Sequence, residues 1–384
     1  MPVMHLAYSW TPYAESVGGI DSSLNCFLRY AERHWPGRID VESLAGERAE
    51  PQAGRCATRI AIRPICSREA SPIPVNLRFL FSLWRNKSRF DSHAVHYIHR
   101  TDHALAYLAD DRPPLVLYIH GSAEHLSLPN ESKLRLVRRG MPFVEEAVIR
   151  RSSHVFICSE RGKRYYAQRH PRYASRLEVL PSAVDEDRFH PIAPEDARRA
   201  LGIDQAAFLV LFAGRIEEVK DPLLWVNAFH QVCARMPNAR GAILGTGALG
   251  PETLRMLECY GISHRLLCAK SVPEAELALW YNAADVLLLT SHFEGSPRVA
   301  VEALACGTPV VTTDVGDVPE MRASGAPVTI VDSRDPIALA EAVVEYAGYE
   351  KKLCPEFVRT HSLATVFGRV IEVLKTAAEG TARV

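Results

Sequence analysis

The sequence predicts an α/β protein made of two doubly wound, Rossmann-like domains that face each other across a cleft. Short, continuously apolar runs alternate with longer helical patterns, which is typical of parallel strands covered by helices on both faces. A length of 384 residues suits two domains of ordinary size. A polar, proline-bearing stretch at 180–203 divides the chain, so we expect domains at 1–190 and 191–384. The last helix either stays with the second domain or packs back on the first.

Six apolar runs are the expected buried strands. They are PLVLYIHG (114–121), SHVFICSE (153–160), FLVLFAGR (208–215), RGAILGTG (240–247), DVLLLTS (285–291) and TPVVTTDVG (308–316). Helical patterns fill the intervals, among them 135–150, 222–235, 274–284 and 298–306. In such sheets ligands bind beyond the carboxyl ends of the strands, so the residues that follow each strand are the candidates for function.

The composition is that of an ordinary globular protein, with 47% hydrophobic and 23% charged residues, and it argues against a disordered or fibrous chain. No run approaches the ~18 apolar residues of a membrane span. The start, MPVMHLAYSW, lacks the basic and long apolar regions of a signal peptide. The nine cysteines are scattered and include no C-x-x-C pair, which favours reduced thiols in a cytoplasm over disulfides or a zinc site.

Charge is unevenly distributed although the net charge is zero. Residues 1–190 carry 27 Lys and Arg against 21 Asp and Glu, a balance of +6, so residues 191–384 carry −6. Nine basic residues and two acidic ones lie between Arg55 and Arg100. No nucleic-acid-binding motif accompanies this excess, so we expect no nucleic-acid partner.

Two cations follow the expected strand LVLFAG. Arg215 and Lys220 stand just ahead of a helix that begins near Pro222, an arrangement that suits an anion such as a diphosphate. The alternative is a pair of solvated surface charges. A second helix start is predicted at Ser296 and Pro297, with Ser at the N-cap and Pro at the first helical position. Its exposed N–H groups would face the same anion.

The stretch HFEGSPRVAVEALACGTPVV (292–311) contains two carboxylates in different settings. Glu294 lies in a turn-forming segment, and Glu302 follows within an apolar run, where an unpaired buried charge costs several kcal/mol, on the order of known buried-ion penalties. If a nucleotide diphosphate lies at the helix start, Glu302 can accept from two ribose hydroxyls. Glu294 can then reach the group beyond the phosphates. The alternative is that Glu302 faces water on an amphipathic helix.

Several ordered motifs resemble those of the retaining nucleotide-sugar glycosyltransferases of family 4, which have the GT-B fold. The run EGSPRVAVEALACGTPVVTTDVGDVPE resembles their E-x7-E signature. Four shorter segments agree in order: GGI (18–20) with the glycine-rich loop, YIHG (118–121) with the His-Gly pair, LPSAVDEDRF (180–189) with the connector N-G-V-D-x-x-x-F, and AGRIEEVKDP (213–222) with G-R-x-x-x-x-K-G. The resemblance is strong from about 205 to 320 and weak across 40–110.

The resemblance implies four catalytic candidates. Arg215 and Lys220 would neutralise the donor diphosphate and stabilise the departing nucleotide, the electrostatic role that a metal has elsewhere, so no metal or other cofactor is expected. Glu294 would bind the donor sugar close to its reacting carbon. His120 would contact the sugar from the opposite domain.

The resemblance also implies a set of binding groups. Glu302 would hold the ribose, and backbone groups at Ser271 and Val272 would read the base. Gly18 and Gly19 would let the N-terminal loop approach the phosphates and the acceptor, with Gly19 against the donor diphosphate.

One departure from the family concerns the donor sugar. Family members often have E-G-F-G where this chain has Glu294-Gly295-Ser296-Pro297. Ser296 is still expected at the diphosphate, but Pro297 lacks the backbone N–H that the second glycine would offer the sugar. The sugar contacts are therefore less transferable than the phosphate contacts.

Two motifs suggest other chemistry. GTGALG (245–250) matches the dinucleotide pattern G-x-G-x-x-G, but it sits in the middle of a domain rather than on a first strand. DED (185–187) imitates the metal-binding D-x-D of another glycosyltransferase fold, but it lies in the connector, where a solvated turn is expected.

Segment 75–90, VNLRFLFSLWRNKSRF, has two interpretations. It could lie on an anionic membrane as an amphipathic helix, or it could pack on the N-terminal sheet as a core helix. Its predicted apolar face holds Leu77, Leu80, Phe81 and Trp84, and the opposite face holds Arg78, Ser82, Arg85 and Arg89.

Together these features predict a retaining transferase that moves a sugar from a nucleotide-diphosphate sugar to an acceptor hydroxyl. We expect a glycan or lipid-linked acceptor of a surface polysaccharide, reached at the cytoplasmic face of a membrane by peripheral contact. A soluble small-molecule acceptor is the alternative. A non-catalytic sensor of sugar nucleotides is the interpretation from a different class of protein.

Overall fold

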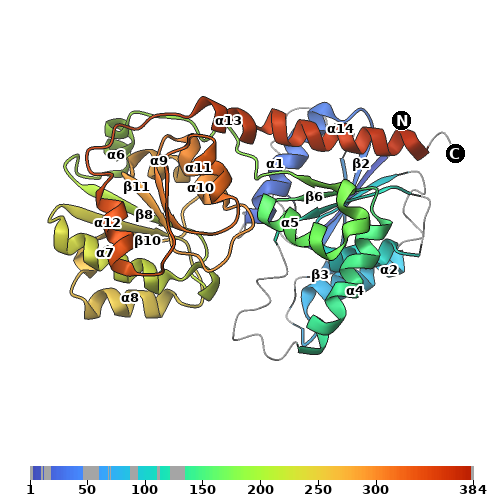
Figure 1. The fold of residues 1–384 in the computed structure, drawn as a ribbon, viewed down its shortest axis with the longest axis horizontal. Coiled ribbons are helices and arrows are strands. Elements are labelled where there is room, and N and C mark those ends of the chain that lie inside the picture. The colour runs from blue at the N-terminus through green and yellow to red at the C-terminus, as the bar shows by residue number, and fades with distance from the viewer. Residues whose placement is uncertain are drawn as a thin grey trace. The chain divides into compact units, whose positions relative to one another are not determined.

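The structure, a computed structural model, describes residues 3–9, 12, 19–45, 60–67, 69, 71–86, 94–109, 113–121 and 135–381. The chain divides into two compact units, each with its own parallel β-sheet (Figure 1). The first unit comprises Met1–Pro181 and Val366–Val384, and the second comprises Ser182–Thr365.

A seven-stranded sheet forms the centre of the first unit. The strands run in the order β3-β2-β1-β4-β5-β6-β7 with parallel neighbours, so the chain starts in the middle and winds outward in both directions, as in Rossmann-like domains. The strands are β1 (Val3–Ala7), β2 (Arg38–Ala45), β3 (Ile60–Ser67), β4 (Val95–Ile98), β5 (Leu115–Ile119), β6 (His154–Ile157) and β7 (Leu177–Val179).

Helices cover both faces of this sheet, with α14 on one face and α2 and α4 on the other (Figure 1). They are α1 (Gly19–His34), α2 (Val75–Asn86), α3 (Thr101–Ala104), η2 (Leu105–Tyr107), α4 (Arg135–Arg151), α5 (Glu160–Arg169), η5 (Pro171–Arg176) and α14 (Leu363–Thr381). The two strands and the helix predicted in this part of the chain, at 114–121, 153–160 and 135–150, are confirmed as β5, β6 and α4.

A six-stranded parallel sheet forms the centre of the second unit, in the order β10-β9-β8-β11-β12-β13. The strands are β8 (Phe208–Ala213), β9 (Ala239–Leu244), β10 (Leu266–Lys270), β11 (Val286–Leu289), β12 (Val310–Thr313) and β13 (Val328–Val331). The helical elements are α6 (Pro194–Leu201), η6 (Glu218–Lys220), α7 (Pro222–Arg235), α8 (Gly250–Cys259), η7 (Ser263–Arg265), α9 (Glu274–Ala283), α10 (Arg298–Ala305), α11 (Val318–Ala323), α12 (Pro336–Val344) and α13 (Pro355–His361).

Strand β8 shows why the predicted strands of this unit are apolar throughout. Phe208, Val210 and Phe212 belong to the core with α7, α8 and α12. The alternate residues, among them Leu209 and Leu211, belong to the core with α9, α10 and α11 on the other face. Because successive side chains of a strand point to opposite faces, a strand covered on both sides must be apolar at every position.

The boundary between the units lies at Pro181 and Ser182, earlier than the 190/191 division expected from the sequence. The connector already bonds to the second unit here. The Ser182 amide donates to the Ser296 hydroxyl at 3.0 Å, and the Val184 amide donates to the His361 carbonyl at 2.8 Å. These backbone bonds fix residues 182–189 to the second unit although they precede its first strand.

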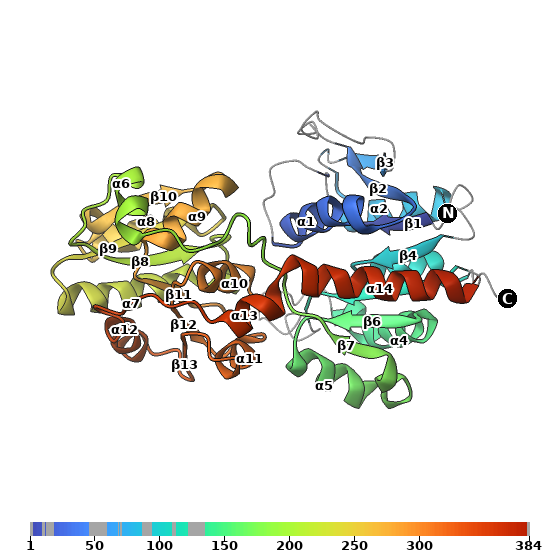
Figure 2. The ribbon, with the colours of Figure 1, turned by 90° about the horizontal axis from the view of Figure 1, so that it is seen from above.

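The last helix, α14, packs on the first unit beside α1 (Figure 2). The rings of Phe367 and Phe27 meet edge to face with centroids 5.4 Å apart. Arg369 adds two hydrogen bonds to the carboxylate of Glu178, at 2.8 and 3.0 Å. The C-terminal helix therefore packs on the unit whose sheet contains β1, the first strand of the chain.

Helix α2 buries a different face from the one predicted. Phe79 and Leu83 are fully buried, whereas Leu77, Phe81 and Trp84 are 45%, 62% and 58% exposed. The helix thus packs on the core and also presents most of its predicted apolar stripe outward; the last four residues of segment 75–90 lie outside the described residues. None of the helices in the described ranges is long and apolar enough to cross a membrane.

Candidate functional site

Three loops of the candidate site in the second unit follow three neighbouring strands, β8, β11 and β12. Parallel strands bring their carboxyl ends to one edge of the sheet, so loops far apart in the sequence meet there. Lys220, Glu294 and Asp317 come from these three loops.

Lys220 and Glu294 form a partly buried ion pair at this edge. The Lys220 ammonium donates to Glu294 Oε1, and the Ser291 hydroxyl donates to the same oxygen at 2.7 Å. Only 17% of the Lys220 side chain and 11% of the Glu294 side chain are exposed. The structure therefore brings two predicted catalytic candidates into direct contact, and Lys220 is not the solvated surface charge of the alternative interpretation.

Arg215 lies in the loop after β8, as predicted, but it does not join this pair. Its guanidinium pairs with Glu217 at 2.6 Å, and 48% of its side chain is exposed. A half-exposed surface pair stabilises a fold only weakly, so Arg215 can exchange Glu217 for another anion at little cost.

The loop that carries Lys220 is fixed from β11 and from a residue after β13. The Thr290 hydroxyl donates to the carbonyls of Lys220 and Asp221, at 3.1 and 2.9 Å. Arg334 pairs with Asp221 and donates to the carbonyls of Thr290 and Ser291, at 2.9 and 3.0 Å. Nothing in the local sequence predicts this role for Arg334, because its partners are distant in the chain.

The glycines of GTGALG have a structural function. A Cβ at Gly245 would lie 1.9 Å from the carbonyl oxygen of Gly214, and one at Gly247 would lie 2.3 Å from that of Ile216. Gly245 also has a φ of +157°, which side chains disfavour. The loops after β8 and β9 therefore pack backbone to backbone, which explains the motif without a dinucleotide.

Helix α10 begins at Arg298, as the helical pattern at 298–306 predicts, and one residue after the start expected from Ser296 and Pro297. Arg298 is its first residue and Pro297 stands at the N-cap, so the predicted N-cap function of Ser296 is wrong. The Ser296 hydroxyl accepts from the Ser182 amide at 3.0 Å, and the Ser182 hydroxyl donates to the Ser296 carbonyl at 3.0 Å. Ser296 thus binds the connector, a partner that local sequence cannot reveal.

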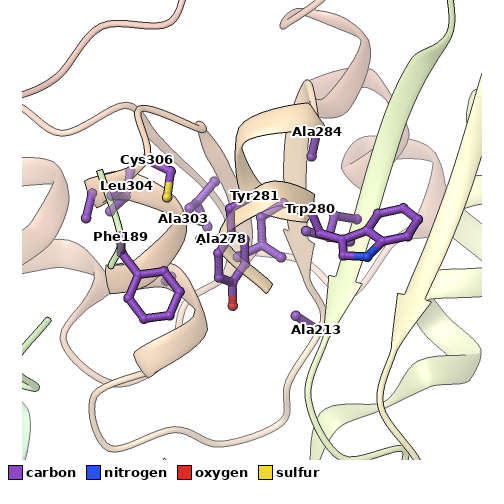
Figure 3. Close-up of a cluster of buried hydrophobic side chains, with 14 of the residues drawn as sticks. Phe189, Ala213, Ala278, Trp280, Tyr281, Ala284, Ala303, Leu304 and Cys306 are labelled. Atoms are coloured by element: carbon purple, nitrogen blue, oxygen red, sulfur yellow. The ribbon is translucent and has the colours of Figure 1, made fainter. Parts of the chain in front are cut away.

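Glu302 is buried and has partners inside the unit. Arg298 donates to its Oε1 at 3.0 Å and the Tyr281 hydroxyl donates to its Oε2 at 3.1 Å. Burial raises the pKa of Glu302 above its ordinary value, and Arg298 and Tyr281 oppose this shift. Only 5% of Glu302 is exposed, so it does not face water. Figure 3 shows Tyr281 within the apolar cluster that surrounds it, near Phe189.

A second buried carboxyl, Asp317, lies beside the loop that carries Glu294. A Cβ at Gly316 would meet the Gly295 carbonyl oxygen at 2.6 Å, so the two loops are in close contact. Asp317 is 2% exposed, and burial raises its pKa to about 8. The Ser296 hydroxyl opposes this shift, but neither carboxyl oxygen has a hydrogen-bond partner of normal geometry in the described part of the chain. Asp317 is not among the site residues predicted from the sequence.

The residues predicted to read the base follow β10. Ser271 is exposed and Val272 is partly buried against the apolar core. The Gly245 amide donates to the Lys270 carbonyl at 3.0 Å, which ties this segment to the loop after β9.

In the first unit, the structure describes two of the three predicted site residues. His120 directly follows β5, is partly buried, and forms a hydrogen bond with His99 across 2.7 Å. Gly19 is the exposed first residue of α1. Gly18 lies outside the described residues.

The DED segment forms a turn in the connector. The amides of Arg188 and Phe189 donate to the Asp185 carbonyl at 3.1 and 2.8 Å, and Glu186 accepts from the Leu363 amide at 3.1 Å. Within the described ranges, no group of three or more His, Cys, Asp or Glu side chains is placed to hold a metal ion.

Two family models match adjoining parts of the chain. The model for glycosyltransferase family 4 matches residues 26–188, and the model for glycosyl transferases group 1 matches residues 194–352. The second match contains all the candidate residues of the second unit.

Curated relatives carry the name D-inositol 3-phosphate glycosyltransferase. The protein of Geodermatophilus obscurus is 32% identical over 284 residues, which are 71% of this chain and 63% of that protein. The protein of Frankia alni is 33% identical over 208 residues, 52% of this chain and 51% of that protein. The chain therefore spans less than two thirds of the length of these relatives.

Solved structures share the fold over nearly the whole chain. Sucrose-phosphate synthase from Thermosynechococcus elongatus has a TM-score of 0.77 at 17% identity, covering 98% of this chain and 99% of that one. Anabaena HepE in complex with UDP and glucose has a TM-score of 0.73 at 18% identity, covering 98% and 100%. These likenesses confirm the predicted GT-B fold. The chain belongs to the glycosyltransferases that the two models describe, family 4 over residues 26–188 and group 1 over residues 194–352.

Proposed function

We propose that the protein transfers a sugar from a nucleotide-diphosphate sugar to an acceptor hydroxyl with retention of anomeric configuration. The observation that carries this proposal is the Lys220–Glu294 pair at the carboxyl edge of the second sheet. It places a cation suited to a diphosphate and a carboxylate suited to sugar hydroxyls at one point, with Arg215 in the same loop as Lys220. The UDP and glucose bound by Anabaena HepE support a donor of this class.

The proposed chemistry uses Arg215 and Lys220 as fixed positive charges. The bond from the anomeric carbon to the donor phosphate breaks while the acceptor oxygen bonds to the same carbon on the same face. The acceptor proton passes to the departing phosphate, whose charge the two cations stabilise. Glu294 orients the sugar and is not the nucleophile. Transfer should therefore persist in excess EDTA, and complete loss of activity on chelation would contradict this mechanism.

A substitution tests the cation directly. Lys220→Ala should remove ~2–4 kcal/mol of transition-state stabilisation, by analogy with the loss of an oxyanion donor. Ser291→Ala is the matched control, because it removes the other hydrogen bond to Glu294 and leaves the cation in place. An equal loss of kcat/KM in both variants would assign the effect to the position of Glu294 rather than to the charge of Lys220.

Incubation with UDP-, GDP- and ADP-sugars and a panel of acceptors tests the function as a whole. Transfer to an acceptor, or slow hydrolysis of the donor, supports the enzyme. Donor binding with neither reaction would favour a non-catalytic sensor.

For the acceptor, we propose a lipid-linked glycan at the cytoplasmic face of a membrane, in the synthesis of a surface polysaccharide. The supporting observation is the outward stripe of Leu77, Phe81 and Trp84 on α2, with the cations Arg78 and Arg85 on the same helix. On α4, which covers the same face of the sheet, Phe143 is 76% exposed. Apolar side chains flanked by basic ones suit an anionic lipid surface, which attracts each basic residue by about 1 kcal/mol.

The second candidate acceptor is a small soluble molecule. It is favoured by the name of the curated relatives, D-inositol 3-phosphate glycosyltransferase. Transfer assays with inositol phosphates and with lipid-linked acceptors in vesicles separate the two candidates, because only the lipid acceptor should require the exposed face of α2.

A further inference from the structure

Two histidines meet at the carboxyl ends of β4 and β5 in the first unit. His99 directly follows β4 and His120 directly follows β5, and these strands are parallel neighbours. His99 Nδ1 and His120 Nε2 are 2.7 Å apart, with ring centroids 5.0 Å apart and ring planes within 19° of each other. The two imidazoles therefore share one nearly coplanar hydrogen bond.

His99 is buried and rigidly packed. It is 5% exposed, and the Tyr97 ring meets it edge to face with centroids 4.3 Å apart. Burial lowers the pKa of His99 well below its ordinary value, and the neighbouring His120 and His103 act in the same direction. A neutral imidazole has one N–H donor and one bare nitrogen, so His99 either donates to His120 or accepts from it.

The surroundings of His99 favour donation. Its other nitrogen, Nε2, is buried, and no described residue forms a hydrogen bond with it. If Nδ1 accepted from His120, the proton of His99 would be on Nε2 as a buried N–H without an acceptor, which is rarer in proteins than an acceptor that lacks a donor. If Nδ1 carries the proton, only a bare acceptor is left without a partner. The N–H of His99 Nδ1 therefore points to His120 Nε2.

We propose that His99 is a positioning residue that fixes His120 in the tautomer protonated at Nδ1. His120 Nε2 is occupied as an acceptor, so in neutral His120 the only N–H is at Nδ1. This inference rests on the proposed function and on the contact of His120 with the donor sugar that the family resemblance implies. It adds that His120 meets an oxygen of its ligand as a hydrogen-bond donor, through Nδ1, and that Nε2 is not available as a base.

The tautomer can be read without any substrate. In the full-length protein labelled with ¹⁵N-histidine, long-range ¹H–¹⁵N correlation spectra distinguish a protonated ring nitrogen from a bare one, and His120→Gln identifies the resonances of His120. We expect protonated Nδ1 and bare Nε2 in the wild type. The opposite pattern would overturn the proposal, whether or not transferase activity is found.

Variants of His99 test the cause. His99→Phe keeps the ring volume and removes the donor, so His120 should shift towards the form protonated at Nε2. His99→Asn places an amide N–H near the position of Nδ1 and should keep the wild-type pattern. His96→Phe is the matched control, because His96 is a buried histidine of β4 that bonds to His5 instead. If the tautomer of His120 is unchanged in His99→Phe, the proposal is wrong. If His99→Phe does not fold, the spectra of the wild type and of His99→Asn test the proposal instead.

Activity gives a second readout. Loss of one hydrogen bond to a positioned group corresponds to a fall of about three- to tenfold in kcat/KM for His99→Phe, with recovery in His99→Asn. If no donor or acceptor is turned over by the wild type, the proposed function fails and the tautomer result still stands. If transfer occurs and His99→Asn falls as far as His99→Phe, the positioning function fails alone.

Discussion

At the scale of single residues, the burial of Asp317 predicts how the free energy of unfolding changes with pH. Burial raises the pKa of its carboxyl to about 8, so the folded protein holds this proton more tightly than the unfolded chain does. The stabilisation is complete at low pH and is lost as the pH rises from the ordinary pKa of about 3.9 towards the folded value. Each pH unit in that window removes about 1.4 kcal/mol from the free energy of unfolding.

We expect Asp317→Asn to remove this loss. The variant should be more stable than the wild type at pH 7 and should have no such advantage near pH 4. Urea unfolding at a series of pH values measures the difference. Asp314→Asn is the matched control, since Asp314 is an exposed carboxylate of the same loop. Wild-type and Asp317→Asn curves that stay parallel across the window would show that Asp317 is ionised in the folded state.

Glu302 shows which contacts of a single residue can be predicted from the sequence and which cannot. Its apolar surroundings correctly indicated a buried carboxylate that needs a partner. One partner, Arg298, is four residues earlier on the same helix, a spacing that the sequence itself displays. The other, Tyr281, comes from α9 and is brought there by the packing of the two helices. Only the first could have been predicted from the chain.

At the scale of elements, the loop after β9 makes a prediction that separates packing from ligand binding. Gly245→Ala should lower the melting temperature, because the new Cβ would lie 1.9 Å from a backbone oxygen and φ is +157°. Gly250→Ala is the control within the same motif, since nothing lies within 4 Å of its Cβ position. Differential scanning calorimetry measures both. Equal melting temperatures for Gly245→Ala and the wild type would mean that the close approach of the two loops is not required.

The exposed face of helix α2 predicts that the protein binds to anionic membranes. The double variant Phe81→Ser/Trp84→Ser removes two exposed apolar side chains, and Arg78→Glu/Arg85→Glu reverses two charges. Each pair should weaken sedimentation with anionic vesicles at low salt, the first more than tenfold if both side chains insert, at about 1.5–3 kcal/mol each. Leu254→Ser, a change to a 43% exposed leucine on α8 of the second unit, should have no effect. A wild type that ignores anionic vesicles would leave α2 as a core helix with an exposed face.

The first sheet shows why some elements escaped prediction. Strand β2 carries Asp40 and Glu42, which are 3% and 1% exposed. Arg63 of β3 pairs with both carboxylates, at 3.1 and 3.3 Å. These buried charges interrupt the apolar run that identifies a central strand. Arg38 of the same strand also pairs with Asp40, but the cation that the two carboxylates share, Arg63, lies on another strand. The six predicted strands have no such interruption, and all six are present.

At the scale of the whole molecule, the division into two units depends on contacts between residues that are far apart in the chain. The composition places a boundary in the polar stretch 180–203, and the structure has it at Pro181 and Ser182. The exact position depends on backbone bonds of Ser182 and Val184 to distant residues. The return of α14 to the first unit depends on Phe367 and Arg369, whose partners are more than 100 residues away in the chain. Pairings of this kind leave no local signal.

The distribution of the candidate residues between the two units gives a final prediction. All the proposed contacts to the diphosphate, ribose and base except those of the loop at Gly18 and Gly19 lie in the second unit: Arg215, Lys220, Ser271, Val272, Ser296 and Glu302. A nucleoside diphosphate without sugar or acceptor should therefore protect the second unit. At one hundred times its dissociation constant it should add about 2.7 kcal/mol to the stability of the state that binds it.

Hydrogen exchange of the full-length chain, with UDP, GDP and ADP in turn, measures this protection segment by segment. We expect slower exchange in the loops after β8 and β11 and in α10, with one base stronger than the others. The matching nucleoside is the control, because it lacks the diphosphate that Arg215 and Lys220 are proposed to bind. Equal protection by nucleoside and nucleotide would show that Arg215 and Lys220 do not bind the diphosphate. Protection confined to the first unit would show that the nucleotide binds there and not in the second unit.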